Sequence, residues 1–287
     1  MRLVGSALLV MAVAGNAAGE IRETSFQSPS LGREVQYVVE LPDSYATGEG
    51  RYPVLYVLHG LFEGPGFWKR RGLSPILHQA EEEKDVPELI VVAVDGGNSF
   101  FANGPTGRFE DLVTRDIVDH VESTYRVEKG RQGRALLGIS MGGYAALRIA
   151  LEHPEAFAAV AAHSAMVLEE IPSAAEGAGR WHMAAFHQVF GDPIDPELWR
   201  AADPLSWVGS ADKVRLPALY FDCGSEDRYR LYEGNQELHR RLEAAGIPHQ
   251  FTLAPGDHGY EFVRSRLRES LSFLGRRLRS ADHGPSR

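Results

Sequence analysis

Short apolar runs alternate with longer amphipathic segments along most of the chain. Residues 34–41 alternate between polar and apolar types, as a half-buried strand does, and residues 24–28 can pair with them as a hairpin. Other runs are apolar without alternation, which suits parallel strands that are covered on both faces. These runs are residues 54–58, 89–94, 135–139, 157–162, 218–221 and 250–253.

Helical periodicity fills most of the intervals between these runs. Gly246 and Pro248 follow one such segment and form a typical helix stop. Because strands alternate with helices, we expect an α/β fold with a mostly parallel central sheet and helices on both faces. The segments in which apolar residues recur at helical spacing are residues 111–125, 143–152, 232–245 and 261–278.

Residues 166–216 interrupt this alternation. No strand is evident there, and tryptophan and phenylalanine residues are scattered through the region. We interpret it as a helical excursion over the edge of the sheet, forming a partial lid beside a site. A second small domain, or helices far from any ligand, is the alternative interpretation.

The composition indicates one folded domain with a sizeable core. Of the 287 residues, 44% are hydrophobic and 24% are charged. We expect a single domain over residues 20–280 and a polar tail at 281–287. The formal net charge of −9 argues against nucleic acid as a partner. Cys223 is the only cysteine, so no internal disulfide can form.

The first nineteen residues have the pattern of a secretory signal peptide. Arg2 gives a short positive start, residues 3–15 are apolar or small, and small residues surround a cleavage point at 16–19. The apolar core is too short to span a membrane comfortably. We therefore expect an exported protein, secreted or periplasmic, that is soluble and not stably inserted in a membrane.

The strongest chemical signal is the sequence Gly-Ile-Ser-Met-Gly at residues 138–142. It follows a predicted strand and opens into a predicted helix, which is the context of a nucleophile elbow. The sharp turn places the serine in strained backbone with its hydroxyl exposed above the sheet. A Cβ atom at either flanking glycine would collide with the neighbouring strand or helix. We take Ser140 as the candidate nucleophile.

A serine nucleophile needs a histidine base and a carboxylate that fixes the histidine tautomer. In sheet-based hydrolases these follow the serine in the order acid, then histidine. His258 lies in a glycine-flanked loop after the strand at 250–253 and is the candidate base. Asp227 is the preferred acid in the loop after 218–221, with Glu226 as the alternative, and we interpret Asp222 as an acceptor for backbone N–H groups of that loop.

Two backbone N–H groups are candidates for the oxyanion hole. One belongs to Met141, the residue after the nucleophile, and the other to Leu61, in the loop that follows the strand at 54–58. Gly60 allows a close approach of this loop, and we expect His59 to brace it rather than to titrate. The sequence contains neither an H-E-x-x-H motif nor paired C-x-x-C motifs, so we expect no metal and no cofactor.

Aromatic residues near these motifs are candidates for substrate binding. Trp68, Phe100 and Tyr229 are the selected positions, and Phe101 and Trp181 are further candidates. Together they would line an aromatic cleft suited to sugar-linked or phenolic acyl groups. Packing in the core or at the rim is an equally good interpretation of each one.

Four segments of the chain resemble the esterase D-like α/β hydrolases, a family that includes S-formylglutathione hydrolases, feruloyl and acetylxylan esterases, and mycolyltransferases. The segments are HGLFEGPGFW at 59–68, GISMGGYAALRIALEHPEAF at 138–157, FDCGSEDRY at 221–229 and PGDHGYEF at 255–262, and FGDPIDPELWRAADPLSWV at 190–208 is also similar. The resemblance implies an α/β-hydrolase fold and the same triad and oxyanion donors. Family members often carry tryptophan where Tyr260 stands, and the cysteine-bearing loops of the S-formylglutathione hydrolases are not evident.

The motifs and the resemblance together predict an exported serine carboxylesterase. Its substrate would be a small-molecule or carbohydrate ester carrying a small acyl, acetyl or feruloyl group. One alternative is an acyltransferase that moves the acyl group to a sugar hydroxyl. A second is a non-catalytic binding protein on a hydrolase scaffold, because a fold does not fix a function.

Overall fold

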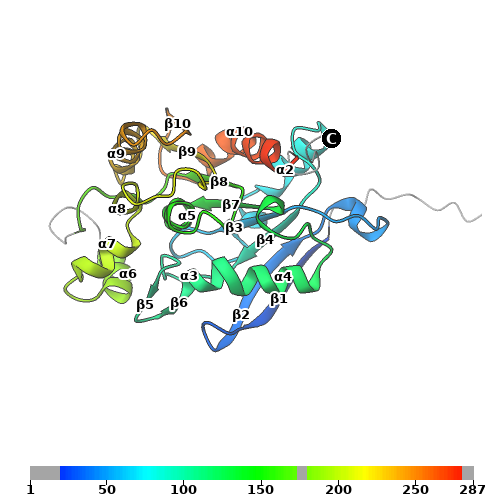
Figure 1. Ribbon diagram of the computed structural model, residues 1–287, viewed down its shortest axis with the longest axis horizontal. Coiled ribbons are helices and arrows are strands. Elements are labelled where there is room, and N and C mark those ends of the chain that lie inside the picture. Colours follow the sequence, from blue (N-terminus) through cyan, green and yellow to red (C-terminus); the bar gives the residue numbers. More distant parts are fainter. Residues whose placement is uncertain (1–19, 173–179, 280–287) are drawn as a thin grey trace, which may run out of the picture.

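An eight-stranded sheet with the strand order β1-β2-β4-β3-β7-β8-β9-β10 forms the centre of the protein in a computed structural model that describes residues 20–172 and 180–279 (Figure 1). β1 (Ile21–Ser28) and β2 (Arg33–Glu40) form an antiparallel hairpin, and β2 also pairs antiparallel with β4 (Ile90–Val94). All other pairings in this sheet are parallel. The remaining strands are β3 (Val54–Leu58), β7 (Arg134–Ile139), β8 (Ala159–His163), β9 (Ala218–Gly224) and β10 (His249–Ala254).

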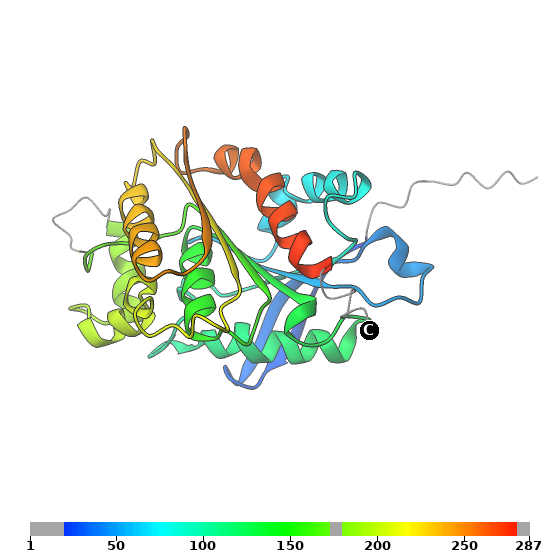
Figure 2. The ribbon, with the colours of Figure 1, turned by 45° about the horizontal axis from the view of Figure 1, so that its top comes forward.

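Both faces of the sheet are covered, because its central strands are apolar on both sides. In β3, Tyr56 and Leu58 join one core cluster, whereas Leu55 and Val57 join the other. Figure 2 shows α10 and α2 over one face and the green helices against the opposite face. The first layer contains α1 (Phe67–Arg70), α2 (Ser74–Glu82) and α10 (Tyr260–Arg279), and the second contains α4 (Ile117–Thr124), α5 (Met141–Glu152) and α9 (Leu231–Ala244).

The predicted elements are found with small shifts at their ends. The six apolar runs correspond to β3, β4, β7, β8, β9 and β10, and the mostly parallel sheet is confirmed. The helix predicted at 111–125 consists of α3 (Phe109–Asp111), a π-helical turn η2 (Leu112–Asp116) and α4. Short elements absent from the prediction are α1, α2, η1 (Asp43–Ala46), η3 (Arg131–Gly133), β5 (Asn103–Gly104) and β6 (Gly107–Arg108).

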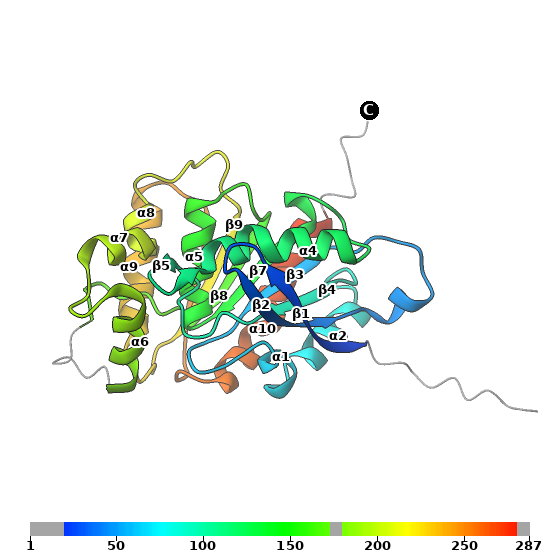
Figure 3. The same cartoon turned by 90° about the horizontal axis from the view of Figure 1, so that it is seen from below.

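The described part of residues 166–216 contains helices and no strand, as predicted. It contains α6 (Arg180–Phe190), α7 (Pro196–Ala202) and α8 (Pro204–Trp207), which gather at one end of the sheet in Figure 3. Aromatic rings dock these helices onto the α5 layer. The ring of Trp199 lies 6.3 Å from that of Tyr144, and the ring of Phe186 lies 4.8 Å from that of Phe100.

The predicted signal peptide at 1–19 and the predicted tail at 281–287 lie outside the described residues. Within residues 20–172 and 180–279, no helix combines the length and the apolar character needed to cross a membrane.

Glu81 of α2 links the stability of the fold to pH. Burial raises the pKa of its carboxyl group to about 7, although the N–H of Leu89 donates to Oε1 at 3.0 Å. The folded state thus favours the neutral acid, and this contribution to stability is lost as the pH rises through about 7. We expect Glu81→Gln, which keeps an acceptor for Leu89, to raise the free energy of unfolding at pH 9 by up to about 3 kcal/mol.

Urea unfolding at pH 4 and pH 9 tests this expectation. The difference in the free energy of unfolding between Glu81→Gln and the wild type should be close to zero at pH 4, where the side chain at position 81 is neutral in both proteins. Glu82→Gln is the matched control, because Glu82 is the exposed neighbour on the same helix. An equal effect of Glu81→Gln at both pH values would mean that ionisation of Glu81 does not affect folding.

Candidate active site

Ser140 stands between β7 and α5 in strained backbone. Its φ of +56° and ψ of −113° lie outside the regions that residues with a side chain normally adopt. Backbone hydrogen bonds hold this conformation: the Ser140 N–H donates to His163 O at 2.9 Å, and Ser140 O accepts from Tyr144 N and Met166 N. The strand, turn and helix of a nucleophile elbow are therefore present at the predicted position.

The two glycines of the motif are required by close backbone contacts. A Cβ atom on Gly138 would collide with the carbonyl oxygen of Gly142 at the start of α5. A Cβ atom on Gly142 would collide with the carbonyl oxygen of Leu58 at the end of β3. Only glycine at both positions lets strand and helix meet at the angle that exposes Ser140.

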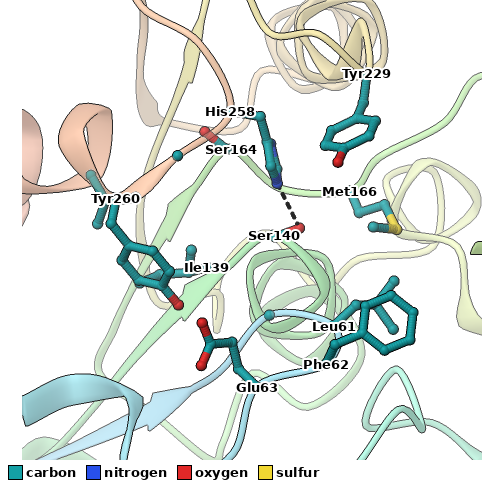
Figure 4. Close-up of a pocket in the computed structure, with 13 residues that line it drawn as sticks. Leu61, Phe62, Glu63, Ile139, Ser140, Ser164, Met166, Tyr229, His258 and Tyr260 are labelled. Carbon is teal, nitrogen blue, oxygen red and sulfur yellow. Dashed lines mark hydrogen bonds between the residues drawn. The ribbon is translucent and has the colours of Figure 1, made fainter. Parts of the chain in front are cut away.

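Ser140, His258 and Asp227 form one chain of hydrogen bonds, of which Figure 4 shows the contact between His258 and Ser140. His258 Nε2 lies 3.1 Å from Ser140 Oγ, and His258 Nδ1 lies 2.8 Å from Asp227 Oδ2. A proton on Nδ1, donated to the carboxylate, leaves the lone pair of Nε2 for the serine hydroxyl. The three side chains that the sequence selected are thus brought together in the order that proton transfer from serine requires.

Of Asp227, Glu226 and Asp222, only Asp227 reaches His258. Its side chain is buried, and Oδ1 accepts a hydrogen bond from the Tyr229 N–H at 2.9 Å. Glu226 is exposed to solvent. Asp222 is buried, but its partners are the side chains of His163 and Tyr220, each at 2.9 Å, instead of the backbone N–H groups that we expected.

The loops that carry Asp227 and His258 are fastened to each other. The Glu226 N–H donates to Gly256 O at 2.9 Å. The Asp257 carboxylate accepts from the backbone N–H groups of Arg228, at 2.8 Å, and of His258, at 2.6 Å, and it also forms an ion pair with the Arg228 guanidinium. These contacts with Arg228 hold the pKa of Asp257 well below its usual range, so the carboxylate stays ionised and fixes the backbone of His258.

His59 orients the loop that carries the second candidate oxyanion donor. The ring is buried, and its Nε2 accepts from the Gly96 N–H at 3.1 Å, so the ring proton is on Nδ1 and donates to Gly60 O at 2.8 Å. In a trans peptide the C=O and the N–H point in opposite directions. Fixing Gly60 O on His59 therefore turns the Leu61 N–H away from the His59 ring.

We expect His59→Ala to lower kcat for an aryl acetate by about 10²-fold, with a much smaller change in KM. The peptide between Gly60 and Leu61 would lose its anchor, and loss of one oxyanion donor costs about 10²–10³ in kcat. Steady-state kinetics and a thermal melt of the same preparation measure the two quantities. Partial recovery in His59→Gln, which restores a side-chain donor, is expected. A loss confined to thermal stability would contradict an orienting role.

Ser140 and His258 open into a cavity of about 220 Å³ whose two ends differ in chemistry (Figure 4). Ser140 and His258 lie between the ends. We call one side the polar end: its polar groups belong to Glu63 and Tyr260, and the side chain of Ile139 also lies there. The opposite side is the apolar end, which consists of Leu61, Phe62, Met166 and the ring of Tyr229, whose hydroxyl group also faces the cavity.

Of the three aromatic residues selected for substrate binding, Tyr229 lines the cavity, with its ring edge-on to His258 at 5.0 Å between centroids. The expectation is wrong for Trp68, which is 2% exposed and donates its indole N–H to Glu40 Oε2 at 2.9 Å. It is also wrong for Phe100, which is fully buried beside Phe186. Phe101 is buried as well, and the side chain of Trp181 lies outside the described residues.

No sequence motif marks Phe62 or Glu63 as a site residue, and Tyr260 stands out only as a departure from the family pattern. All three line the cavity. Only their positions in the chain point to the site. Phe62 and Glu63 follow Leu61 directly, and Tyr260 is two residues beyond His258.

A second group of ligand-type side chains lies away from this cavity. Glu110, Glu152 and His153 are close enough to share an ion. The buried guanidinium of Arg148 forms ion pairs with both glutamates, at 2.9 Å to Glu152 Oε2. Because the Arg148 guanidinium already pairs with both carboxylates, we interpret this group as a structural ion-pair network and assign no metal to it.

A family described as a putative esterase matches residues 28–274 of the chain. Esterase Rv1288 of Mycobacterium tuberculosis is 28% identical over 286 residues, covering 90% of this chain and 59% of that protein. The chain thus spans about three fifths of the length of this relative. S-formylglutathione hydrolase of Paracoccus denitrificans is 25% identical over 272 residues, covering 88% of this chain and 91% of that protein.

A solved structure of a ferulic acid esterase is also similar to this protein. The TM-score is 0.75 at 28% sequence identity, and the match covers 91% of this chain and 98% of the other. The likeness agrees with the strand order and the helical layers described above, and the predicted α/β-hydrolase fold is confirmed.

Proposed function

The chain belongs to the putative esterase family, and on this premise we propose that it is a serine carboxylesterase. The observation that carries the proposal is the relay from Asp227 through His258 to the hydroxyl of Ser140, which opens into a cavity. A hydroxyl in contact with a neutral imidazole, itself fixed by a buried carboxylate, is activated for attack on an acyl carbon.

In the proposed reaction, Ser140 Oγ attacks the ester carbonyl and its proton passes to His258 Nε2. The backbone N–H groups of Leu61 and Met141 stabilise the negative charge that develops on the carbonyl oxygen. His258 then returns the proton to the departing alcohol, which leaves an acyl group on Ser140. Water, activated by the same imidazole, attacks the acyl-enzyme and releases the acid.

Two features of the relay, and the names of the relatives, support this sequence of steps. Asp227 is buried, so its interaction with the imidazolium that forms during attack is little screened by water. The strained backbone of Ser140 fixes the direction of its hydroxyl before substrate binds. The relatives carry names of ester- and thioester-hydrolysing enzymes, in agreement with acyl transfer to water.

A panel of esters tests the proposal. It should run from acetyl and butyryl aryl esters to feruloyl sugars and acetylated xylan, and we expect hydrolysis of at least the short aryl esters. Analysis of the products with and without added carbohydrate separates hydrolysis from acyl transfer to a sugar. Activity confined to amide bonds, or binding of esters without turnover, would overturn the assignment.

We also propose that the protein is exported, as the pattern of Arg2 and the apolar residues 3–15 indicates. Its single folded domain would begin near residue 20. Expression of the full chain in a bacterial host, followed by N-terminal sequencing of the extracellular or periplasmic product, tests this. A product that keeps Met1 and stays in the cytoplasm would contradict it.

A further inference from the structure

The polar end of the cavity is built from side chains that the relay does not use. Figure 4 shows the carboxylate of Glu63 and the hydroxyl of Tyr260 on one side of Ser140, across the cavity from Met166 and Tyr229. Glu63 comes from the loop after β3 and Tyr260 from the first residue of α10. Two polar groups from distant parts of the chain therefore converge beside the proposed nucleophile.

Two arginines hold the Glu63 carboxylate in place. Arg70 Nη2 lies 2.9 Å from Oε2, and Arg71 Nε lies 2.9 Å from Oε1. The Glu63 side chain is only 12% exposed, whereas both arginines extend to the surface. Each carboxylate oxygen can accept more than one hydrogen bond. Arg71 Nη2 donates to Oε1 as well, so Glu63 is a rigid acceptor whose remaining lone pair, on Oε2, is left for a group in the cavity.

Tyr260 is held in place by Arg71, one of the two arginines that bind Glu63, and by Phe67. The guanidinium of Arg71 lies over its ring, 4.7 Å from the centroid, and the ring of Phe67 lies 6.4 Å away on the core side. Burial raises the pKa of the Tyr260 hydroxyl above its ordinary value, so the group is a neutral phenol that can both donate and accept a hydrogen bond.

The charges at the polar end restrict what it can bind. An anionic group would gain no hydrogen bond from Glu63, because an ionised carboxylate only accepts hydrogen bonds. A cationic group would gain little, because Arg70 and Arg71 already neutralise that carboxylate from behind. An acceptor beside a donor, without surplus negative charge, suits neutral hydroxyl groups. The apolar end suits a hydrocarbon acyl chain, since burial of apolar surface is favourable there.

We propose that Glu63 and Tyr260 form a subsite for the hydroxyl groups of a neutral polyol, which is the alcohol part of the ester, while the acyl chain occupies the apolar end. This inference rests on the proposed function, because it concerns the substrate of the same site. We therefore expect the protein to prefer esters of polyols, such as glycerol or a sugar, to esters of simple alkanols.

A matched pair of substrates tests the subsite. Glyceryl monobutyrate and propyl butyrate share the acyl group and the three-carbon alcohol, and they differ in two hydroxyl groups. We expect kcat/KM of the wild-type protein to be at least tenfold higher for the glyceryl ester. One hydrogen bond to a charged group is worth about 1.5–3 kcal/mol, and tenfold corresponds to about 1.4 kcal/mol.

Tyr260→Phe and Glu63→Gln should each reduce this preference by about three- to thirtyfold. Tyr260→Phe keeps the ring under Arg71 and removes the hydroxyl group, which also interacts with Arg71, so it separates hydrogen bonding by this hydroxyl from packing of the ring. Tyr52→Phe is a control for the same chemical change at a residue that does not line the cavity. Thermal melts of each variant exclude a general loss of folding.

The possible outcomes separate the two proposals. If neither butyrate is hydrolysed and aryl esters are also inert, the proposed function fails. If both butyrates are hydrolysed at similar kcat/KM, the esterase assignment stands and the polyol subsite is wrong. If Tyr260→Phe and Glu63→Gln lower kcat/KM equally for both esters, the assembly only supports the loop after β3, and the subsite is again wrong.

Discussion

Replacing Ser140 by alanine is expected to lower kcat for p-nitrophenyl acetate by at least about 10⁴-fold. The hydroxyl 3.1 Å from His258 Nε2 is the only group of the relay placed to attack an acyl carbon. Its loss leaves only the stabilisation that the oxyanion donors and substrate binding give to direct attack by water. Residual activity of this kind is usually small but measurable.

The Ser140→Ala variant should fold as the wild type does. The hydrogen bonds that hold the strained turn are made by backbone atoms of Ser140, with His163, Tyr144 and Met166, and alanine preserves all of them. Both residues also pay a similar cost for a positive φ. A thermal melt close to that of the wild type would therefore accompany the loss of activity.

Covalent labelling gives a second readout for this prediction. A fluorophosphonate probe should label the wild-type protein once and leave Ser140→Ala unlabelled. Ser123→Ala serves as the matched control, because Ser123 belongs to α4 and does not line the cavity. Labelling of Ser140→Ala at the wild-type rate, or retention of near-native kcat, would remove Ser140 from the mechanism.

The sheet could be predicted because its signals are local. β3 is a fully buried run of five apolar residues, and its predicted and observed bounds coincide. The elbow could be predicted for the same reason: strand, glycine, serine, glycine and helix follow one another within a few residues. His258 and Asp227 then follow from chain order and from loops that leave parallel strands at the same edge of the sheet.

The residues that line the cavity depend on contacts between distant segments, and the sequence carries little sign of them. Trp68 lies in the core because its indole N–H donates a hydrogen bond to Glu40, which is 28 positions earlier in the chain. Phe100 is buried by rings of α6, in the region that interrupts the strand and helix pattern. Glu63 enters the cavity because two arginines of the α1 segment hold it. Nothing in the periodicity of these segments distinguishes such partners.

Helix α2 is a further element that the sequence pattern does not predict. It has nine residues and begins with serine and proline, so its apolar stripe covers little more than two turns. A segment this short has a weak periodic signal, and tertiary packing against α10 supplies most of its stability. Length, more than composition, separates the helices that were predicted from α1 and α2, which were not.

Replacing Asp227 by asparagine is expected to lower kcat by about 10⁴-fold with little change in KM. The reason is the direction of the hydrogen bonds around this side chain. The Tyr229 N–H at 2.9 Å requires an acceptor at the position of Oδ1, so the asparagine oxygen would take that place. The amide NH₂ would then face His258 Nδ1 and donate to it.

A donor at Nδ1 forces the imidazole into the wrong tautomer. The ring proton would move to Nε2 and point at the hydroxyl of Ser140, where the lone pair of the base is needed. The opposite orientation of the amide would set its NH₂ against the Tyr229 N–H and is disfavoured. The substitution is nearly isosteric, so the buried site should keep its packing while the base is lost.

Glu226→Gln discriminates between the two acids that the sequence left open. Glu226 is the exposed neighbour of Asp227, and its replacement should leave kcat within about twofold of the wild type. Steady-state kinetics of the two variants on one aryl ester therefore form a matched comparison at adjacent positions. A large loss in Glu226→Gln together with a small loss in Asp227→Asn would assign the carboxylate role to Glu226 and would require the loop after β9 to rearrange when substrate binds.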